Sequence, residues 1–348
     1  MSPQPKIGVA IIGAGEAGLR RALSLPPGHL VTAFDLNTAR SEALVARAGC
    51  GKATRNIEDA IHHPSVDAVI ISTVHRPLAE VALGALADRK HVLIESPGAA
   101  SARQLGALEK KAKPHGLVVR VGFHHRSRRA VAKARKLVEE GQIGGVMFLR
   151  GCFGTARPMG FERSWRADLR KCAGGQLLDE GIHLLDLANW FVPRFNSIRG
   201  TLSNLYWQMP VEDNAFVELR NSKGQIAWLH TSSTEWKDRF SFEIFGQKGK
   251  LQIEGYHGIY GPERLHVHAL QPGSAPPETI VYEYPDRDTS WDDDTISFLR
   301  DIELQRRPSP GLPEAQAALE MVEKIYSQTG YPIPNVPHEV LGRHFDDQ

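Results

Sequence analysis

The sequence pairs an acid with a histidine at Asp179 and His183, and a glycine pair at 174–175 precedes them. In a helix, four positions separate side chains that lie on one face, one turn apart. Imidazole titrates near neutral pH and is suited to moving a proton. A nearby carboxylate can orient the ring, stabilise its charged form or bind substrate hydroxyls. Because such a pair is unspecific alone, a helix-terminal acid and a buried core histidine remain an alternative interpretation.

A second chemical motif is the glycine hexad Gly13-Ala14-Gly15-Glu16-Ala17-Gly18, which follows an apolar strand at Ile7–Ile12 and opens a helix. In this context Gly13 permits a tight turn, Gly15 lets a pyrophosphate approach the backbone, and Gly18 permits close packing of helix on strand. Free N–H groups at the start of the helix then face the phosphates. We expect the first five residues of the hexad to contact a dinucleotide cofactor.

Asp35 distinguishes between the two nicotinamide dinucleotides. It lies at the end of the second predicted strand, 20 positions after Gly15. A carboxylate there can bind the hydroxyls of the adenosine ribose and would repel a 2′-phosphate, which favours NAD over NADP. Arg40 is close enough to leave NADP open, although it more simply belongs to the surface of the next helix.

The elements around these motifs form two patterns, and the first covers residues 1–123. Short strands that are apolar on both faces alternate there with helices, which predicts a parallel, doubly wound sheet of the Rossmann type. The predicted strands are Ile7–Ile12, His29–Phe34, Ala68–Ile71, His91–Ile94 and Leu117–Val121. The predicted helices are Glu16–Leu25, Thr38–Ala48, Leu78–Ala87 and Ser101–Lys113.

The second pattern covers residues 124–310 and predicts an α+β domain with a large, mostly antiparallel sheet. Its helices are expected at Ser127–Glu140, Leu177–Phe191 and Trp291–Gln305. Strands of alternating polarity are expected at Val146–Phe153, Ala215–Leu219, Ile226–Thr231, Phe240–Phe245 and Lys250–Ile253. Residues 311–348 are expected to form a C-terminal helix at Glu314–Gln328 and a tail, packed back on the first domain.

Composition narrows the class of protein. The chain has 348 residues and a formal net charge of +2 with acids and bases dispersed, so it lacks the basic patch that nucleic-acid binding requires. We expect no membrane partner either, since no apolar run reaches spanning length and the N-terminus does not resemble a signal peptide. Three cysteines without a paired spacing predict reduced thiols in the cytoplasm and no structural zinc site.

Several segments together resemble one family. They are Ala10-Ile11-Ile12-Gly13-Ala14-Gly15, Ser72-Thr73, Glu95-Ser96-Pro97, Val121-Gly122-Phe123 and Gly174-Gly175-Gln176-Leu177-Leu178-Asp179-Glu180-Gly181-Ile182-His183. The chain resembles the glucose–fructose oxidoreductase / inositol dehydrogenase (GFO/IDH/MocA) family over roughly its whole length. The resemblance implies a Rossmann domain, an open-faced sheet through which dimers or tetramers form, and NAD(P)-dependent redox chemistry on sugars, cyclitols or sugar nucleotides.

The resemblance also implies roles for single residues. Asp179 and His183 would line the substrate site, and Thr73 and Glu95 would lie beside the cofactor. Family members commonly carry Glu-Lys-Pro where this chain has Glu95-Ser96-Pro97, and the lysine assists proton transfer. Ser96 has no ammonium group, but its hydroxyl can bond a substrate oxygen or relay a proton.

Five further residues are candidates for the site. His75 stands where the family often has an asparagine, so it either contacts the cofactor or fills the loop. His124 and His125 follow the strand Leu117–Val121, where a ligand crevice opens. Either can serve as the proton donor that Ser96 does not provide. The alternative is that both are ordinary domain-boundary residues. The pair Trp165-Arg166 resembles pairs that approach cofactor or substrate in sugar-nucleotide members of the family.

These observations predict an NAD(P)-dependent oxidoreductase that transfers hydride between the nicotinamide and a carbinol of a sugar, cyclitol or nucleotide-linked sugar. His183 would carry the proton, Asp179 would support it, and Ser96 would hydrogen-bond the reacting oxygen. Two alternatives remain open because the lysine is absent. One is an epimerase, lyase or glycosidase-like enzyme that retains NAD and oxidises transiently. The other is a non-catalytic NAD-binding sensor or regulatory subunit. No metal is expected, since no third ligand stands near Asp179 and His183 at motif spacing.

Overall fold

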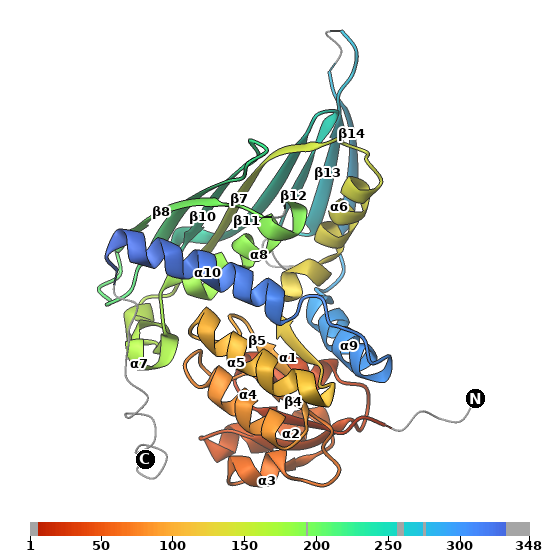
Figure 1. The fold of residues 1–348 in the computed structure, drawn as a ribbon, viewed down its shortest axis with the longest axis vertical. Coiled ribbons are helices and arrows are strands. Elements are labelled where there is room, and N and C mark those ends of the chain that lie inside the picture. Colours follow the sequence, from red (N-terminus) through yellow and green to blue (C-terminus); the bar gives the residue numbers. More distant parts are fainter. Residues whose placement is uncertain (1–5, 193, 256–260, 274–275, 332–348) are drawn as a thin grey trace, which may run out of the picture.

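The chain folds around two sheets, which Figure 1 shows one above the other. The structure is a computed structural model, and it describes residues 6–192, 194–255, 261–273 and 276–331. The first sheet carries the glycine loop, and the second carries the helix that holds His183. The predicted tail beyond residue 331 lies outside the described residues.

The first sheet has six parallel strands in the order β3-β2-β1-β4-β5-β6. The strands are β1 (Val9–Ile12), β2 (Leu30–Phe34), β3 (Lys52–Ala53), β4 (Ala68–Ile71), β5 (His91–Glu95) and β6 (Val119–Gly122). The helices between them are α1 (Glu16–Ser24), α2 (Thr38–Ala48), α3 (Ile57–Ile61), α4 (Leu78–Ala87) and α5 (Ala102–Ala112). The prediction of a parallel doubly wound sheet is confirmed, and only the short elements β3 and α3 were missed.

The apolar strands explain this architecture. Every residue of β1 and β4 is buried, which requires helices on both faces of the sheet. Parallel strands all end at one edge, so the loops after β1, β2, β4 and β5 meet there. That edge faces the second sheet.

The second sheet has eight strands in the order β14-β13-β12-β11-β7-β10-β9-β8. They are β7 (Val146–Ala156), β8 (Ser197–Ser203), β9 (Asn214–Arg220), β10 (Ile226–Ser232), β11 (Thr234–Gly246), β12 (Gly249–Glu254), β13 (Glu263–Ala269) and β14 (Glu278–Tyr284). All pairs are antiparallel except β10 with β7. The predicted, mostly antiparallel sheet is therefore confirmed.

Helices cover one face of this second sheet. They are α6 (Arg129–Glu139), α8 (Ile182–Phe191) and α10 (Leu312–Thr329). Side chains alternate along the central strands: in β10, Ala227 and Leu229 are buried toward the helices, whereas Trp228 between them is exposed. The face opposite the helices is therefore open, and we call it the open face.

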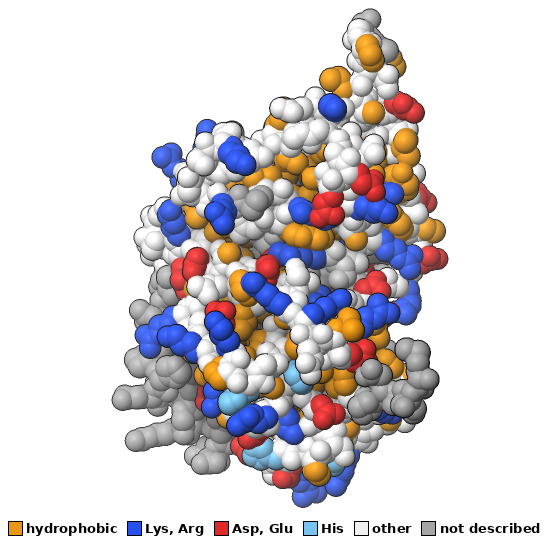
Figure 2. Space-filling view, turned by 45° about the vertical axis from the view of Figure 1, so that its right-hand side comes forward, with side chains coloured by type: hydrophobic (Ala, Val, Ile, Leu, Met, Phe, Trp, Pro, Cys, Tyr) orange, Lys and Arg blue, Asp and Glu red, His pale blue; other side chains and the backbone are white. Residues whose placement is uncertain are grey.

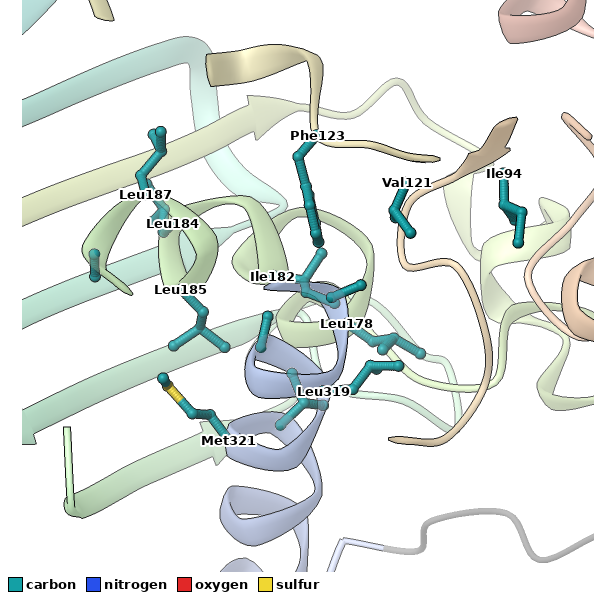
Figure 3. Close-up of a cluster of buried hydrophobic side chains, with 14 of the residues drawn as sticks. Ile94, Val121, Phe123, Leu178, Ile182, Leu184, Leu185, Leu187, Leu319 and Met321 are labelled. Atoms are coloured by element: carbon teal, nitrogen blue, oxygen red, sulfur yellow. The ribbon is translucent and has the colours of Figure 1, made fainter. Parts of the chain in front are cut away.

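One apolar core joins the two sheets. Figure 3 shows side chains from β5 and β6, from the α8 region and from α10 pointing toward one another. They include Ile94, Val121, Phe123, Leu178, Ile182 and Leu319, which all belong to one buried cluster. Helix α10 packs on α5 of the first domain as well as on α8 and β8. A continuous core thus fixes the position of the first sheet relative to the second.

Acidic and basic side chains are interspersed on the face of the molecule that Figure 2 shows. None of the helices in the described part of the chain has the length and apolar character that crossing a bilayer requires.

Candidate functional site

The glycine loop has the geometry that a dinucleotide requires. Gly13 has a φ of +95°, and a Cβ there would lie 2.6 Å from the carbonyl oxygen of Ser72. A Cβ on Gly18 would lie 1.9 Å from the carbonyl oxygen of Gly13. At Gly15, in contrast, a Cβ would meet nothing within 4 Å. The loop is tight on its protein side and open where a pyrophosphate would approach, so these residues fit the cofactor.

Asp35 lies directly beside this loop. One carboxylate oxygen accepts a hydrogen bond of 2.7 Å from the N–H of Ala14, and the other accepts one of 2.8 Å from the N–H of Asn37. Both bonds hold an anionic side chain at the end of β2, next to the start of α1. Its contact with the ribose of NAD remains a prediction.

The helix predicted at Leu177–Phe191 is confirmed, but its first turn is not α-helical. Residues Leu177–Gly181 (η5) form a π-helical turn that runs directly into α8, which begins at Ile182. Such turns are rare overall, and those that occur inside helices are frequently found at functional sites. Asp179 lies in this turn, and His183 lies in the first turn of α8.

Asp179 lies among two arginines and a histidine. It accepts a hydrogen bond of 2.6 Å from Nε of Arg166, and it lies 3.4 Å from both a guanidinium nitrogen of Arg157 and Nε2 of His75. Burial alone would raise the pKa of Asp179, but Arg166, His75 and Arg157 outweigh it and hold the pKa well below its usual range. Asp179 is therefore a fixed anion of the site.

The loop that supplies Arg166 is braced against His75. Nδ1 of His75 donates to the carbonyl oxygen of Cys172 at 2.8 Å, and its ring meets Trp165 edge-on at 4.9 Å. The guanidinium of Arg166 lies 4.5 Å from the centre of the Trp165 ring. Predicted cofactor residues from two segments thus gather beside Asp179.

His183 has a partner from the first domain. Its Nε2 lies 3.1 Å from Oγ of Ser96, which follows β5, and its Nδ1 is buried without a hydrogen-bond partner among the described residues. The side chain of His183 is almost fully buried, and this burial lowers its pKa to about 4, although the charge of Asp179 acts in the opposite direction. His183 is therefore neutral near pH 7 and able to accept a proton.

The two histidines that follow β6 also lie against His183. The ring of His125 stacks on it, with centroids 4.4 Å apart, and the ring of His124 meets it at 5.5 Å. His124 also packs on Trp291 of α9 (Ser290–Glu303), at 4.3 Å. Burial first and His183 next lower the pKa of His124 well below its ordinary value. The structure therefore places three imidazoles together, and burial lowers the pKa of two of them, His124 and His183.

Glu95 and Thr73, two predicted cofactor residues, form hydrogen bonds with other parts of the protein. Glu95 is buried, and its carboxylate receives a hydrogen bond of 2.5 Å from Nε of Arg21 in α1. A Cβ at Gly122 would lie 2.6 Å from Glu95, so this glycine makes room for the ion pair. The hydroxyl of Thr73 donates to the carbonyl oxygen of Val74 at 3.0 Å. Their cofactor contacts remain predictions.

Sequence reasoning missed two residues of the site. Arg157 lies 3.1 Å from Glu180 as well as near Asp179, and Trp291 covers His124 from a helix far along the chain. The local excess of basic residues after β7 was a weak signal for Arg157. Nothing local in the sequence indicates Trp291, because its contact is purely tertiary.

Comparisons with known proteins agree with this architecture. Residues 7–123 match the model described as "Oxidoreductase family, NAD-binding Rossmann fold", and residues 131–252 match the GFO/IDH/MocA C-terminal domain. The chain is 27% identical to 1,5-anhydro-D-fructose reductase of Ensifer adhaerens, over 66% of this chain and 69% of that protein. It is also 27% identical to dTDP-3,4-didehydro-2,6-dideoxy-alpha-D-glucose 3-reductase of Streptomyces antibioticus, over 93% and 97%.

A solved structure supports the fold independently. Levoglucosan dehydrogenase in complex with NADH and levoglucosan superposes with a TM-score of 0.83 at 20% identity, covering 93% of this chain and 97% of that one. The glycine loop, the two sheets and both family models lead to one conclusion. This chain belongs to the GFO/IDH/MocA family of NAD-binding oxidoreductases.

Proposed function

We propose that the protein transfers hydride between a nicotinamide cofactor and a secondary carbinol of a sugar, cyclitol or nucleotide-linked sugar. The observation that carries the proposal is the 3.1 Å contact between Oγ of Ser96 and Nε2 of His183, which joins the two domains. It provides a neutral base and a hydroxyl at the edge of the sheet where the cofactor residues gather.

The cofactor would be held by the glycine loop (Gly13, Ala14, Gly15, Glu16 and Ala17) and by Asp35, which favours NAD over NADP. The dinucleotide supplies the hydride acceptor in oxidation and the hydride donor in reduction. The neutral ring of His183 accepts the carbinol proton in oxidation, and its protonated form returns a proton in reduction. Ser96 hydrogen-bonds the reacting oxygen, in the position where a lysine is usual in the family.

Asp179 supports this proton transfer without taking part in it. Its negative charge favours the protonated form of His183, so it stabilises the ring after the proton has moved. The relatives named as a reductase of an anhydro sugar and as a reductase of a dTDP-linked sugar support a carbohydrate substrate.

The test begins with the purified protein. Mass spectrometry of the denatured sample identifies any retained dinucleotide, and a panel of sugars, cyclitols and NDP-sugars is screened for a change in NADH absorbance. We expect NADH formation or consumption with at least one carbohydrate. Substrate conversion by tightly held NAD without net NADH formation would instead identify the epimerase, lyase or glycosidase-like alternative. Dinucleotide binding with no conversion across the panel would favour the sensor or regulatory alternative.

We also propose that the protein forms a homodimer or homotetramer through the open face. Large apolar side chains are exposed on that face, among them Phe148, Phe216 and Trp228, and exposed apolar patches commonly mark interfaces. Sedimentation should give a mass above that of one chain, and Trp228→Glu should shift the mass toward the monomer.

A cytoplasmic location is proposed from the three unpaired cysteines.

A further inference from the structure

A second group of chemically reactive side chains lies outside the redox site, on the open face of the second sheet. Cys152 of β7, His230 of β10 and Glu235 of β11 each point one donor atom toward a common centre. Sγ of Cys152 is 3.9 Å from Nδ1 of His230 and 3.8 Å from Oε1 of Glu235, and those two atoms are 3.9 Å apart. The donor atoms form a nearly equilateral triangle.

We propose that Cys152, His230 and Glu235 bind a Zn²⁺ ion, with water as the fourth ligand. Tetrahedral zinc bonded to sulfur, nitrogen and oxygen at ordinary lengths holds its ligand atoms about 3.4–3.6 Å apart. The triangle needs to contract by only a few tenths of an ångström to reach this geometry. In the single chain the side chains of His230 and Glu235 are 29% and 22% exposed, so water can reach the fourth position before a second copy covers the open face.

The orientation of His230 is an independent observation that points to a cation. Its Nε2 lies 3.1 Å from Oδ1 of Asn214. The amide nitrogen of Asn214 donates to Asp213 and Thr234, both at 3.0 Å, so the amide oxygen is the atom that faces His230. Nε2 of His230 therefore carries the proton, and the lone pair of Nδ1 points into the triangle. A second hydrogen bond that fixes the ring in this way is the usual support of a zinc-binding histidine.

The fold builds the other sides of the site. The ring of Phe216 stacks flat on His230, with centroids 4.3 Å apart. An irregularity in β11 between Thr234 and Arg239 brings Glu235 over Gly154. A Cβ at Gly154 would lie 2.0 Å from Cγ of Glu235, so glycine makes this approach possible. Burial and Glu235 raise the pKa of the Cys152 thiol to about 11, so the thiol keeps its proton until a metal ion displaces it.

This site is separate from the redox chemistry. Side chains alternate along β7, and Phe153, the neighbour of Cys152, packs on His125 on the covered face at 5.1 Å. The proposed ion lies across the sheet from His183 and would link β7, β10 and β11. Sequence spacing did not indicate it, because the three ligands come together only through strand pairing.

Cobalt is the appropriate spectroscopic probe. The full-length protein, reduced and freed of metal, is titrated with Co²⁺, and Zn²⁺ is then added as a competitor. We expect one Co²⁺ per chain, a thiolate-to-cobalt charge-transfer band, and loss of that band on addition of Zn²⁺. Cys152→Ser should abolish the band, and His230→Gln and Glu235→Gln should each weaken binding by at least about tenfold.

Matched controls are available in the same chain. His266 pairs with Glu254 at 2.9 Å on the same sheet, and Cys50 is another free cysteine, so His266→Gln and Cys50→Ser should leave the band unchanged. Retained NADH binding reports that each variant is folded. If Cys152→Ser does not fold, the His230 and Glu235 variants decide the question. Absence of a thiolate band in the wild type, or unchanged affinity in these variants, overturns the proposal.

Discussion

Asp179 and His183 are four residues apart, yet the structure gives them opposite electrostatic surroundings. Asp179 lies among two arginines and a histidine, which keep it ionised. His183 lies among two other imidazoles and the hydroxyl of Ser96, where burial keeps it neutral. Asp179 lies in the π-helical turn and His183 in the first turn of α8.

This difference assigns separate roles to the two residues: a constant charge for Asp179 and proton transfer for His183. A carboxylate with a strongly lowered pKa cannot exchange protons near pH 7, so it provides a constant charge. A neutral histidine has a free ring nitrogen that can accept a proton, and a lowered pKa means that the ring gives this proton up again readily. Four variants or conditions test whether this division is real.

The largest effect is expected from a substitution of His183. His183→Gln should lower turnover on the identified substrate by about 10²–10⁴-fold, because it removes the group that we propose as the general base. Dinucleotide binding should be unchanged, which a fluorescence titration with NADH checks. His115→Gln alters an exposed histidine and should retain full activity. Full turnover in His183→Gln would remove His183 from the proton transfer.

The second effect is the dependence of stability on pH. The pKa of His183 is lowered from the ordinary 6.5 to about 4 in the folded protein, so the unfolded chain binds more protons between these pH values. Stability should therefore be fully present above about pH 6.5 and should fall by up to about 3 kcal/mol as the pH decreases to about 4. Urea unfolding of wild type and His183→Gln across this range measures the difference. An equally steep loss in the variant would show that other groups, such as His124, cause it.

The third effect is expected from a substitution of Asp179, which lies beside Arg166 and Arg157. Asp179→Asn leaves Arg166 without its hydrogen-bonded carboxylate, whereas Arg157 keeps Glu180. We expect a loss of about 1–3 kcal/mol in the free energy of unfolding. The surface pair Asp168–Arg170 offers the matched control, since Asp168→Asn keeps a side chain that caps a helix equally well and should change stability by less than about 0.5 kcal/mol. Equal effects of the two substitutions would mean that Asp179 is an ordinary surface-like acid.

The smallest effect is expected at Ser96. Ser96→Ala removes one hydrogen bond, worth about 1 kcal/mol, and should lower turnover roughly fivefold. Ser96→Thr retains the hydroxyl and should recover most of the activity. If Ser96→Ala has no effect on turnover, the hydroxyl has no part in the reaction, and the proton then moves between His183 and the substrate alone.

Much of the fold was predictable because its signals are local. Helices α2 and α4 and strand β4 have the predicted bounds, since apolar periodicity and turn residues determine them within a few positions. The π-helical turn at Leu177–Gly181 was not predictable, because its residues are those of an ordinary amphipathic helix. Trp291 was missed for the same kind of reason: its contact with His124 joins segments far apart in the chain.

The sequence by itself determined the cofactor loop, the parallel first sheet and the presence of Asp179 and His183 in one segment, because short-range backbone geometry and hydrophobic periodicity encode these features. Only the tertiary structure decided what each group does. Ser96 reaches His183 across 87 positions of sequence, and Arg166 reaches Asp179 through a folded loop. Burial and neighbouring charge, which follow from packing, then leave one residue ionised and the other neutral.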